Sequence, residues 1–175
     1  MKKIRAKIFW KPRQAVGKIS AKILKASLKK YPRDGVAAFV TVKTGKGERI
    51  LLCKRGKLDQ WAGTWVTGPM EHMQPKETFY NALVRAMREE IRLDVVKLKP
   101  SAWKPLGRVF DKKIGLRGTL FKVEISENDL KKIKTTDEIP EFKLISENDF
   151  KKAVKEKKII LQKHLYPLMK KILKV

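Results

Sequence analysis

The segment "TFYNALVRAMREEIRLDVV", residues 78–96, gathers charged side chains around an apolar pattern. At about 100° per residue, its apolar positions form one stripe, as in a helix that packs on a sheet. These positions are Ala82, Leu83, Ala86, Met87 and Ile91. Glu90 falls near the middle of this stripe, Glu89 falls at its edge, and Arg85 comes one turn before Glu89. A carboxylate inside an apolar stripe is costly unless it is paired or binds a cation, so Glu90 requires a partner.

Two kinds of partner fit Glu90. The first is an arginine in a salt bridge. The second is a divalent cation held jointly by the adjacent Glu89 and Glu90. Mg²⁺ takes oxygen ligands and keeps several waters, which leaves room for the phosphates of a substrate. The segment alone leaves both alternatives open.

A longer run, "HMQPKETFYNALVRAMREEIRL" at 72–93, resembles the Nudix box. The family pattern is Gly, five residues, Glu, seven residues, then Arg-Glu-apolar-any-Glu-Glu-any-Gly-apolar. Seven residues also separate Glu77 from Arg85, and Glu89 and Glu90 match the paired glutamates. The strand-like "ILLCKR" before the box and "DEIPEFKLISENDF" after it are similar to the family as well, so the resemblance covers about residues 35–170.

The resemblance implies an α+β fold, a Nudix-type α/β/α sandwich with a mixed β-sheet. It implies hydrolysis of a nucleoside diphosphate linked to another moiety, or of an RNA 5′ end. Mg²⁺ or Mn²⁺ held by Glu89 and Glu90 would bridge phosphate oxygens and help to generate the attacking hydroxide. Glu77 and Arg85 complete the predicted catalytic set and are expected to orient the helix.

This sequence departs from the family pattern at three places. Ala86 stands where the glutamate after the arginine usually ligates the metal, and Arg92 stands in place of the later glycine. The opening glycine is displaced, since Gly68 lies nine residues before Glu77 and Glu71 holds the fixed position. A site with one ligand fewer binds Mg²⁺ more weakly, so we expect reduced activity.

Nearby acids could compensate in part for the missing ligand. Glu71 lies in the loop before the box, and Asp137 and Glu138 precede the last predicted strand. Trp61 and Trp65 flank the site and could either stack a base or anchor the loop.

The surrounding pattern predicts the elements that position these residues. Residues 35–42 and 49–55 read as two strands of a hairpin, and 94–110 and 116–125 read as further strands, the first interrupted by prolines. Residues 141–145 read as a short last strand. Ser126 and Ser146 each come after a strand and are predicted to cap a helix. A Lys-rich helix, 159–173, is expected near the C-terminus.

Charge is the unusual feature of the composition. The 175 residues carry 43 Lys and Arg against 18 Asp and Glu, a net charge of +25, which favours a polyanionic partner such as nucleic acid. Residues 1–33 contain no acid and are predicted to form a basic amphipathic helical extension before a Nudix-like domain at 34–175. One face of its helix carries Lys18, Lys22, Lys25 and Lys29, a candidate nucleic-acid-binding set. A mitochondrial targeting peptide and a helix packed on the domain are the alternatives.

Two functions therefore compete. One is the Nudix-type hydrolase. The other is a catalytically inactive Nudix-like protein that binds RNA, or a ribonucleoprotein such as the ribosome, through its basic extensions. The single cysteine, Cys53, fits a reducing compartment such as the cytoplasm and reads as a core residue. No apolar run reaches the roughly 18 residues of a transmembrane segment.

Overall fold

The structure is a computed structural model, and it describes residues 33–57, 59, 62–96, 98, 102–111, 116–156 and 158. The N-terminal lysines predicted to bind nucleic acid, Trp61 and the expected C-terminal helix lie outside these residues. No helix among the described residues is long and apolar enough to cross a membrane.

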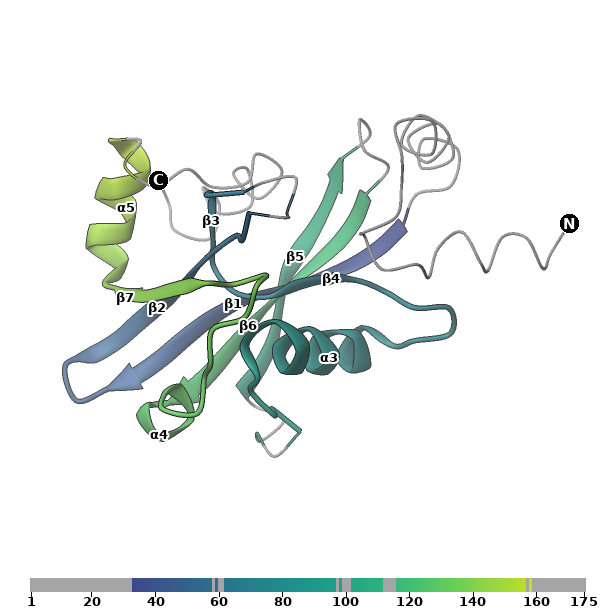
Figure 1. Cartoon of the computed structure of the whole chain (residues 1–175), viewed down its shortest axis with the longest axis horizontal. Helices are drawn as coiled ribbons and strands as arrows, with labels where there is room; N and C mark the ends of the chain where they lie inside the picture. The colour runs from purple at the N-terminus through teal and green to yellow at the C-terminus, as the bar shows by residue number, and fades with distance from the viewer. Residues whose placement is uncertain are drawn as a thin grey trace, which may run out of the picture.

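The described chain is organised around one seven-stranded sheet (Figure 1). The strands are β1 (Arg33–Thr44), β2 (Gly47–Lys54), β3 (Trp65–Val66), β4 (Met70–His72), β5 (Trp103–Asp111), β6 (Leu116–Ser126) and β7 (Glu141–Ile145). The helices are α3 (Phe79–Ile91), α4 (Glu127–Leu130) and α5 (Glu147–Lys155). The main order is β3-β2-β1-β6-β5, with β4 beside β1 and β7 beside β2. β1 and β6 run parallel and the other pairs are antiparallel, so the sheet is mixed as predicted.

The predicted hairpin at the start of the domain is confirmed. β1 and β2 pair up to Thr44 opposite Gly47, which leaves Gly45 and Lys46 as the turn. Gly47 has a φ of 97°, a conformation that glycine adopts without strain. The Thr44 hydroxyl donates to the Gly47 carbonyl at 2.6 Å and accepts from the Lys46 N–H at 3.2 Å, which fixes the turn.

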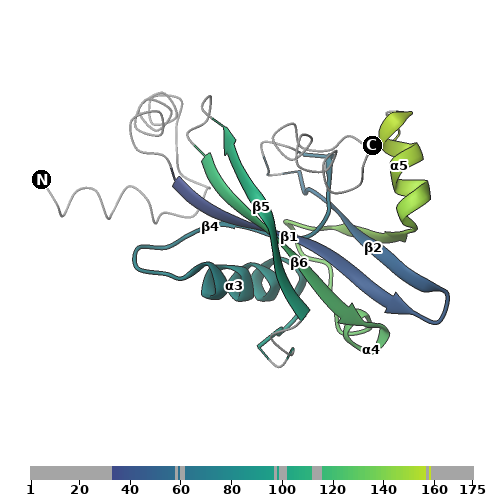
Figure 2. The same cartoon turned by 180° about the vertical axis from the view of Figure 1, so that it is seen from behind.

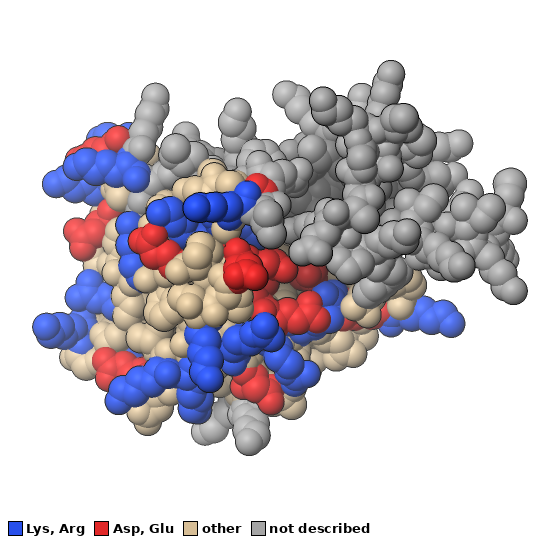
Figure 3. All heavy atoms as spheres, viewed as in Figure 1, with Lys and Arg blue, Asp and Glu red and all other residues tan. Residues whose placement is uncertain are grey.

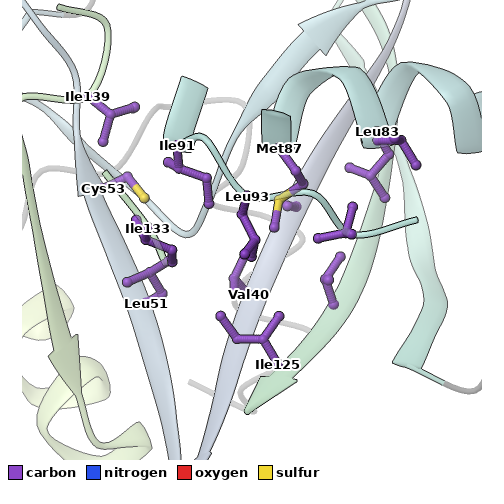
Figure 4. Close-up of a cluster of buried hydrophobic side chains, with 14 of the residues drawn as sticks. Val40, Leu51, Cys53, Leu83, Met87, Ile91, Leu93, Ile125, Ile133 and Ile139 are labelled. Carbon is purple, nitrogen blue, oxygen red and sulfur yellow. The ribbon is translucent and has the colours of Figure 1, made fainter. Parts of the chain in front are cut away.

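Helices cover both faces of the sheet (Figures 1 and 2). Alternate residues of β1 point to opposite faces, since Val40 belongs to the cluster under α3 and Phe39 belongs to the cluster that includes Phe150 of α5. Figure 4 shows the first cluster, where Met87 and Ile91 of α3 meet side chains of the sheet. Its members include Cys53, which is completely buried. The predicted α/β/α sandwich is therefore confirmed.

The helix that carries the box is shorter than the segment that suggested it, and residues 92–96 beyond it form no strand. The Thr78 hydroxyl accepts from the Asn81 N–H at the first turn, and Arg92 ends α3 in the left-handed region at φ 58° and ψ 24°. The predicted strand from residue 94 is wrong in its first part, because β5 begins only at Trp103. Leu93 and Val95 are buried and fill the core beside α3, while their backbone joins no described strand.

The two later helices begin where the sequence predicted. The Ser126 hydroxyl accepts from the Asp129 N–H, and the Ser146 hydroxyl accepts from the Asp149 N–H, each at 3.1 Å. At α4 the Asp129 carboxylate also accepts from the Ser126 N–H, which completes a capping box. A serine hydroxyl thus satisfies one free amide in the first turn of each helix.

Candidate active site

The helical spacing of α3 sets the directions of the predicted site residues. Its apolar stripe is buried as expected, and Ala86 has no exposed surface. Glu90 lies within that stripe with 1% of its surface exposed, whereas the neighbouring Glu89 side chain is 55% exposed. The paired glutamates of the box therefore lie in different environments, because adjacent positions differ by about 100° around a helix.

Glu90 has an arginine partner. Arg55, directly after β2, donates from Nη1 to Glu90 Oε2 at 2.6 Å, and its side chain is 4% exposed. The Met70 N–H donates to Glu90 Oε1 at 2.9 Å, so each oxygen of the carboxylate is bonded. Arg55 also donates to Asp59 through Nε at 2.9 Å and through Nη2. Of the two partners that the sequence allowed for Glu90, the structure contains the arginine.

Burial governs the electrostatics of this cluster. It raises the pKa of Glu90 above its ordinary value, against the lowering effects of the Arg55 charge and the Met70 N–H. Burial also lowers the pKa of Arg55, but the charges of Glu90, Asp59 and Glu138 outweigh it and raise that pKa. The charge on Glu90 therefore depends on Arg55.

A tight packing contact brings Glu138 to this cluster. The Gly56 N–H donates to the Glu138 carbonyl at 2.8 Å. A Cβ at Gly56 would lie only 1.9 Å from the Asp137 carbonyl oxygen, so only glycine allows the two loops to approach. Of the three acids proposed to compensate for Ala86, Glu138 thus acts on the Arg55 cluster through its charge.

Arg85 forms the second cluster, on the accessible edge of α3. Its Nε and Nη2 donate to the two oxygens of Glu77 at 3.0 and 2.9 Å, and Nη2 also donates to the His72 carbonyl at 2.8 Å. Its Nη1 lies 3.4 Å from Glu71 Oε2 and 3.5 Å from Glu89 Oε2. The hydrogen bond from Arg85 lowers the pKa of Glu77. The structure therefore brings Arg85, Glu77 and Glu89 together with Glu71, one of the acids expected to compensate for Ala86.

These residues do not form a preformed metal centre. No group of three His, Cys, Asp or Glu side chains in the described part of the chain could hold a metal ion. Ala86 offers no carboxylate, and Glu90 is buried against Arg55. The accessible donors are Glu89 and Glu71, which both approach Arg85 Nη1. Mg²⁺ is often bound by one or two carboxylates together with substrate phosphates, so this donor set fits an ion that arrives with its substrate.

Sequence reasoning missed Arg55 and Asp59. The signal was present, because a glutamate in an apolar stripe needs a cation and "RILLCKR" ends a buried strand with an arginine. Trp65 is 8% exposed and packs in the cluster with Phe150, so it anchors the β2–β3 region. Lys143 Nζ lies 4.2 Å from the centroid of the Trp65 ring and covers one face of it. This contact and the burial of the ring leave little room for a nucleotide base to stack on Trp65.

Charge is unevenly distributed on the surface that carries α3. Figure 3 shows acidic side chains gathered near the middle of this view and Lys and Arg side chains along its lower part. Acidic and cationic side chains therefore lie side by side on this face of the molecule.

Comparison with known proteins gives one family and many related folds. The family model described as NUDIX domain matches residues 32–167. A search of curated proteins finds no match. A MutT protein from Methanosarcina mazei Go1 is 18% identical, with 81% of this chain and 94% of that chain covered and a TM-score of 0.62.

Two further solved structures are similar. The C. elegans Ap4A hydrolase in a binary complex is 15% identical, with 80% of this chain and 94% of that chain covered and a TM-score of 0.58. The NUDIX domain of Shewanella oneidensis NrtR, complexed with ADP ribose, is 13% identical, with 82% and 88% covered and a TM-score of 0.59. At these identities the likeness shows the fold.

Proposed function

Because the chain belongs to the NUDIX domain family, we propose that it is a Nudix-type hydrolase that cleaves a nucleoside diphosphate linked to another moiety. The observation that carries this proposal is the Arg85 cluster. The box glutamate Glu77 binds Arg85 with both oxygens, and the exposed Glu89 lies one turn further along the same face. This arrangement supports the proposal of a diphosphate site beside α3.

Arg85 acts as a positioning residue in this proposal. Its bidentate bond to Glu77 and its bond to the His72 carbonyl tie α3 to the loop before it. With those bonds in place, Nη1 is left facing Glu71 and Glu89. The two carboxylates are thereby held at the surface beside one another, where a cation and phosphates can approach.

Glu89 and Glu71 are the residues that would hold Mg²⁺ or Mn²⁺ with the substrate. The ion would offset the phosphate charge and make a bound water more acidic. Glu90, the other predicted ligand, could join them only in a state in which it leaves Arg55. Such a state exposes two buried charges, so we expect it to be rare.

We expect the hydrolysis to be slow. Ala86 removes one carboxylate from the box, and the Arg55 bond removes another from the accessible set. The remaining donors bind the ion weakly until phosphates supply further oxygens. The Mg²⁺ concentration that gives half-maximal turnover should therefore fall as the substrate concentration rises.

A hydrolysis panel tests the proposal. Wild-type protein is assayed with Mg²⁺ on nucleoside triphosphates, dinucleotides, nucleotide sugars and 5′-capped RNA. The Glu89→Gln variant should lose turnover by at least about tenfold, since it removes the accessible ligand. The matched control is Glu127→Gln, an exposed glutamate on α4, which should keep wild-type turnover. Turnover that survives in Glu89→Gln would refute the role of this carboxylate.

A second candidate is the catalytically inactive, RNA-binding protein. The alanine at position 86 in place of a glutamate and the Arg55–Glu90 bond favour it, because together they reduce the accessible carboxylates of the box. The net charge of +25 suits RNA or a ribonucleoprotein. Absence of turnover on every member of the panel, with retained RNA binding, would favour this candidate.

A further inference from the structure

A cationic surface lies at the C-terminal end of α3. It is formed by Arg88, Arg92, Lys131, Lys132 and Lys134, all of which are exposed. We propose that this helix-end surface binds the phosphodiester backbone of a nucleic acid. The inference is independent of hydrolysis, because none of these side chains belongs to the Arg85 or the Arg55 cluster.

Backbone contacts hold the two halves of the helix-end surface together. The Lys134 N–H donates to the Ile91 carbonyl at 3.1 Å, which places the loop after α4 against the end of α3. The Thr136 hydroxyl donates to the Glu90 carbonyl at 2.8 Å and reinforces this contact. Ile133 is buried in the core between exposed lysines. The cations therefore stand on a rigid base.

Much of the charge on this surface is not neutralised within the described residues. Arg88 pairs with the exposed Asp94 at 3.1 Å, and Lys132 pairs with the partly buried Asp129 at 2.8 Å. Arg92, Lys131 and Lys134 make no ion pair with a described residue. Glu127 is the other acid on α4. An anionic partner would find open donors.

Arg92 supplies a second observation. It occupies the left-handed region at φ 58°, where glycine would be free of strain, and its side chain is exposed rather than packed. A cation at the end of a helix also interacts with the helix dipole, and that alone would explain Arg88 and Arg92. It does not explain Lys131, which extends from the α4 turn. Binding an external anion accounts for both segments.

The chemistry favours nucleic acid over a membrane. Membrane-surface sites combine cations with several apolar side chains that insert among lipids. The large exposed apolar residues of the described chain are Phe79, Tyr80, Val96 and Leu144. Phe79 and Tyr80 lie at the other end of α3, Leu144 lies on β7, and only Val96 is near the helix-end surface. Guanidinium and ammonium groups that have few apolar side chains beside them suit the phosphates of a nucleic-acid strand better than a membrane surface.

The test compares two triple variants of the full chain that lose the same charge. One is Arg92→Gly with Lys131→Gln and Lys134→Gln. The control is Lys46→Gln, Lys57→Gln and Lys155→Gln, three exposed lysines on other surfaces. Binding to a fluorescent single-stranded RNA of mixed sequence is measured at several salt concentrations with EDTA, which stops any hydrolysis. The basic N-terminal residues stay in both proteins.

We expect the helix-end variant to bind at least about tenfold more weakly and to lower the salt slope by about 2, since each lost phosphate contact contributes about 0.7 on a single strand. The control should stay within about twofold of wild type. Equal losses in the two variants, or no loss in the helix-end variant, would overturn the proposal. A thermal melt that stays at or above that of wild type shows that the fold is intact, because Arg92→Gly relieves strain.

Further arms identify the partner. Single-stranded DNA of the same sequence separates recognition of the backbone from recognition of the 2′-hydroxyl. Phosphatidylserine vesicles form the membrane arm. A helix-end variant that loses vesicle binding but keeps RNA binding would overturn the assignment to nucleic acid. The binding result is unaffected by whether the hydrolysis panel succeeds.

Discussion

The two arginine clusters beside α3 use the same chemistry for different ends. Arg55 holds Glu90 and Asp59 where its side chain is 4% exposed, and Arg85 holds Glu77, with Glu71 and Glu89 nearby, where its side chain is 18% exposed. In the Arg55 cluster, ion pairs and hydrogen bonds take the place of the water that the buried charges lose, so this cluster serves to stabilise the fold. In the second, Glu89 keeps half of its side chain in solvent and can still take a ligand. Exposure, rather than residue type, separates the two roles.

The largest effect is expected from removing the buried arginine. Arg55→Gln takes the cation away from two carboxylates at once and leaves Glu90 buried without a charge partner. We expect a loss of about 3–5 kcal/mol in the free energy of unfolding, measured by urea denaturation. The double variant Arg55→Gln with Glu90→Gln is the control and should recover part of the loss. A loss below about 1 kcal/mol would show that solvent reaches this cluster.

The paired glutamates offer the sharpest comparison. Glu90→Gln weakens a buried charged bond while Arg55 keeps Asp59, so we expect a loss of about 2–3 kcal/mol. Glu89→Gln changes a half-exposed side chain and should stay within about 0.5 kcal/mol. Both values come from the same urea experiment. Equal losses would mean that the two adjacent positions do not differ in environment.

The Arg85 cluster should make the free energy of unfolding depend on pH in the acid range. Arg85 lowers the folded-state pKa of Glu77 below its ordinary value of 4.5. A lowered pKa means that the pair contributes stability above pH 4.5 and loses it as pH falls through the folded-state value. Between pH 7 and pH 3, Glu77→Gln should therefore lose less stability than wild type, by about 1 kcal/mol after allowance for solvent screening.

Glu127→Gln is the reference for that experiment. Its acid response should match that of wild type, since Glu127 is exposed on α4. If the free energy of unfolding fell equally with pH in Glu77→Gln and in wild type, the Arg85 cluster would not be the source of the acid-sensitive stability.

The smallest predicted effect lies at the end of the helix that joins the two clusters. Arg92→Gly relieves a left-handed conformation and should raise the free energy of unfolding by about 0.5–1 kcal/mol, after the entropy that glycine adds to the unfolded chain. Differential scanning calorimetry measures the change. Arg88→Gln, one turn earlier in regular helix, should bring no gain. A loss in Arg92→Gly would mean that the guanidinium stabilises the fold through contacts of its own.

Much of the fold could be predicted because local patterns agreed with it. The hairpin of β1 and β2, the last strand β7 and the caps at Ser126 and Ser146 each depend on neighbouring residues. The strand expected at 94–110 was wrong before Trp103, because residues 92–96 form a loop that fills the core with Leu93 and Val95. Periodicity reports which side chains are buried and does not report whether the backbone finds a partner strand.

By itself, the sequence determined the box, its spacing and the need of Glu90 for a cation. The helical period placed Glu90 in the apolar stripe and Glu89 at its edge, and a buried carboxylate cannot stay charged alone. Only the tertiary structure decided which cation meets it. Arg55 is 35 residues away in the chain, and the approach of β2 to α3 brings its guanidinium to 2.6 Å from Glu90. Ion pairs act through space, so the pattern that predicts a need for a partner cannot name the partner until the sheet has folded.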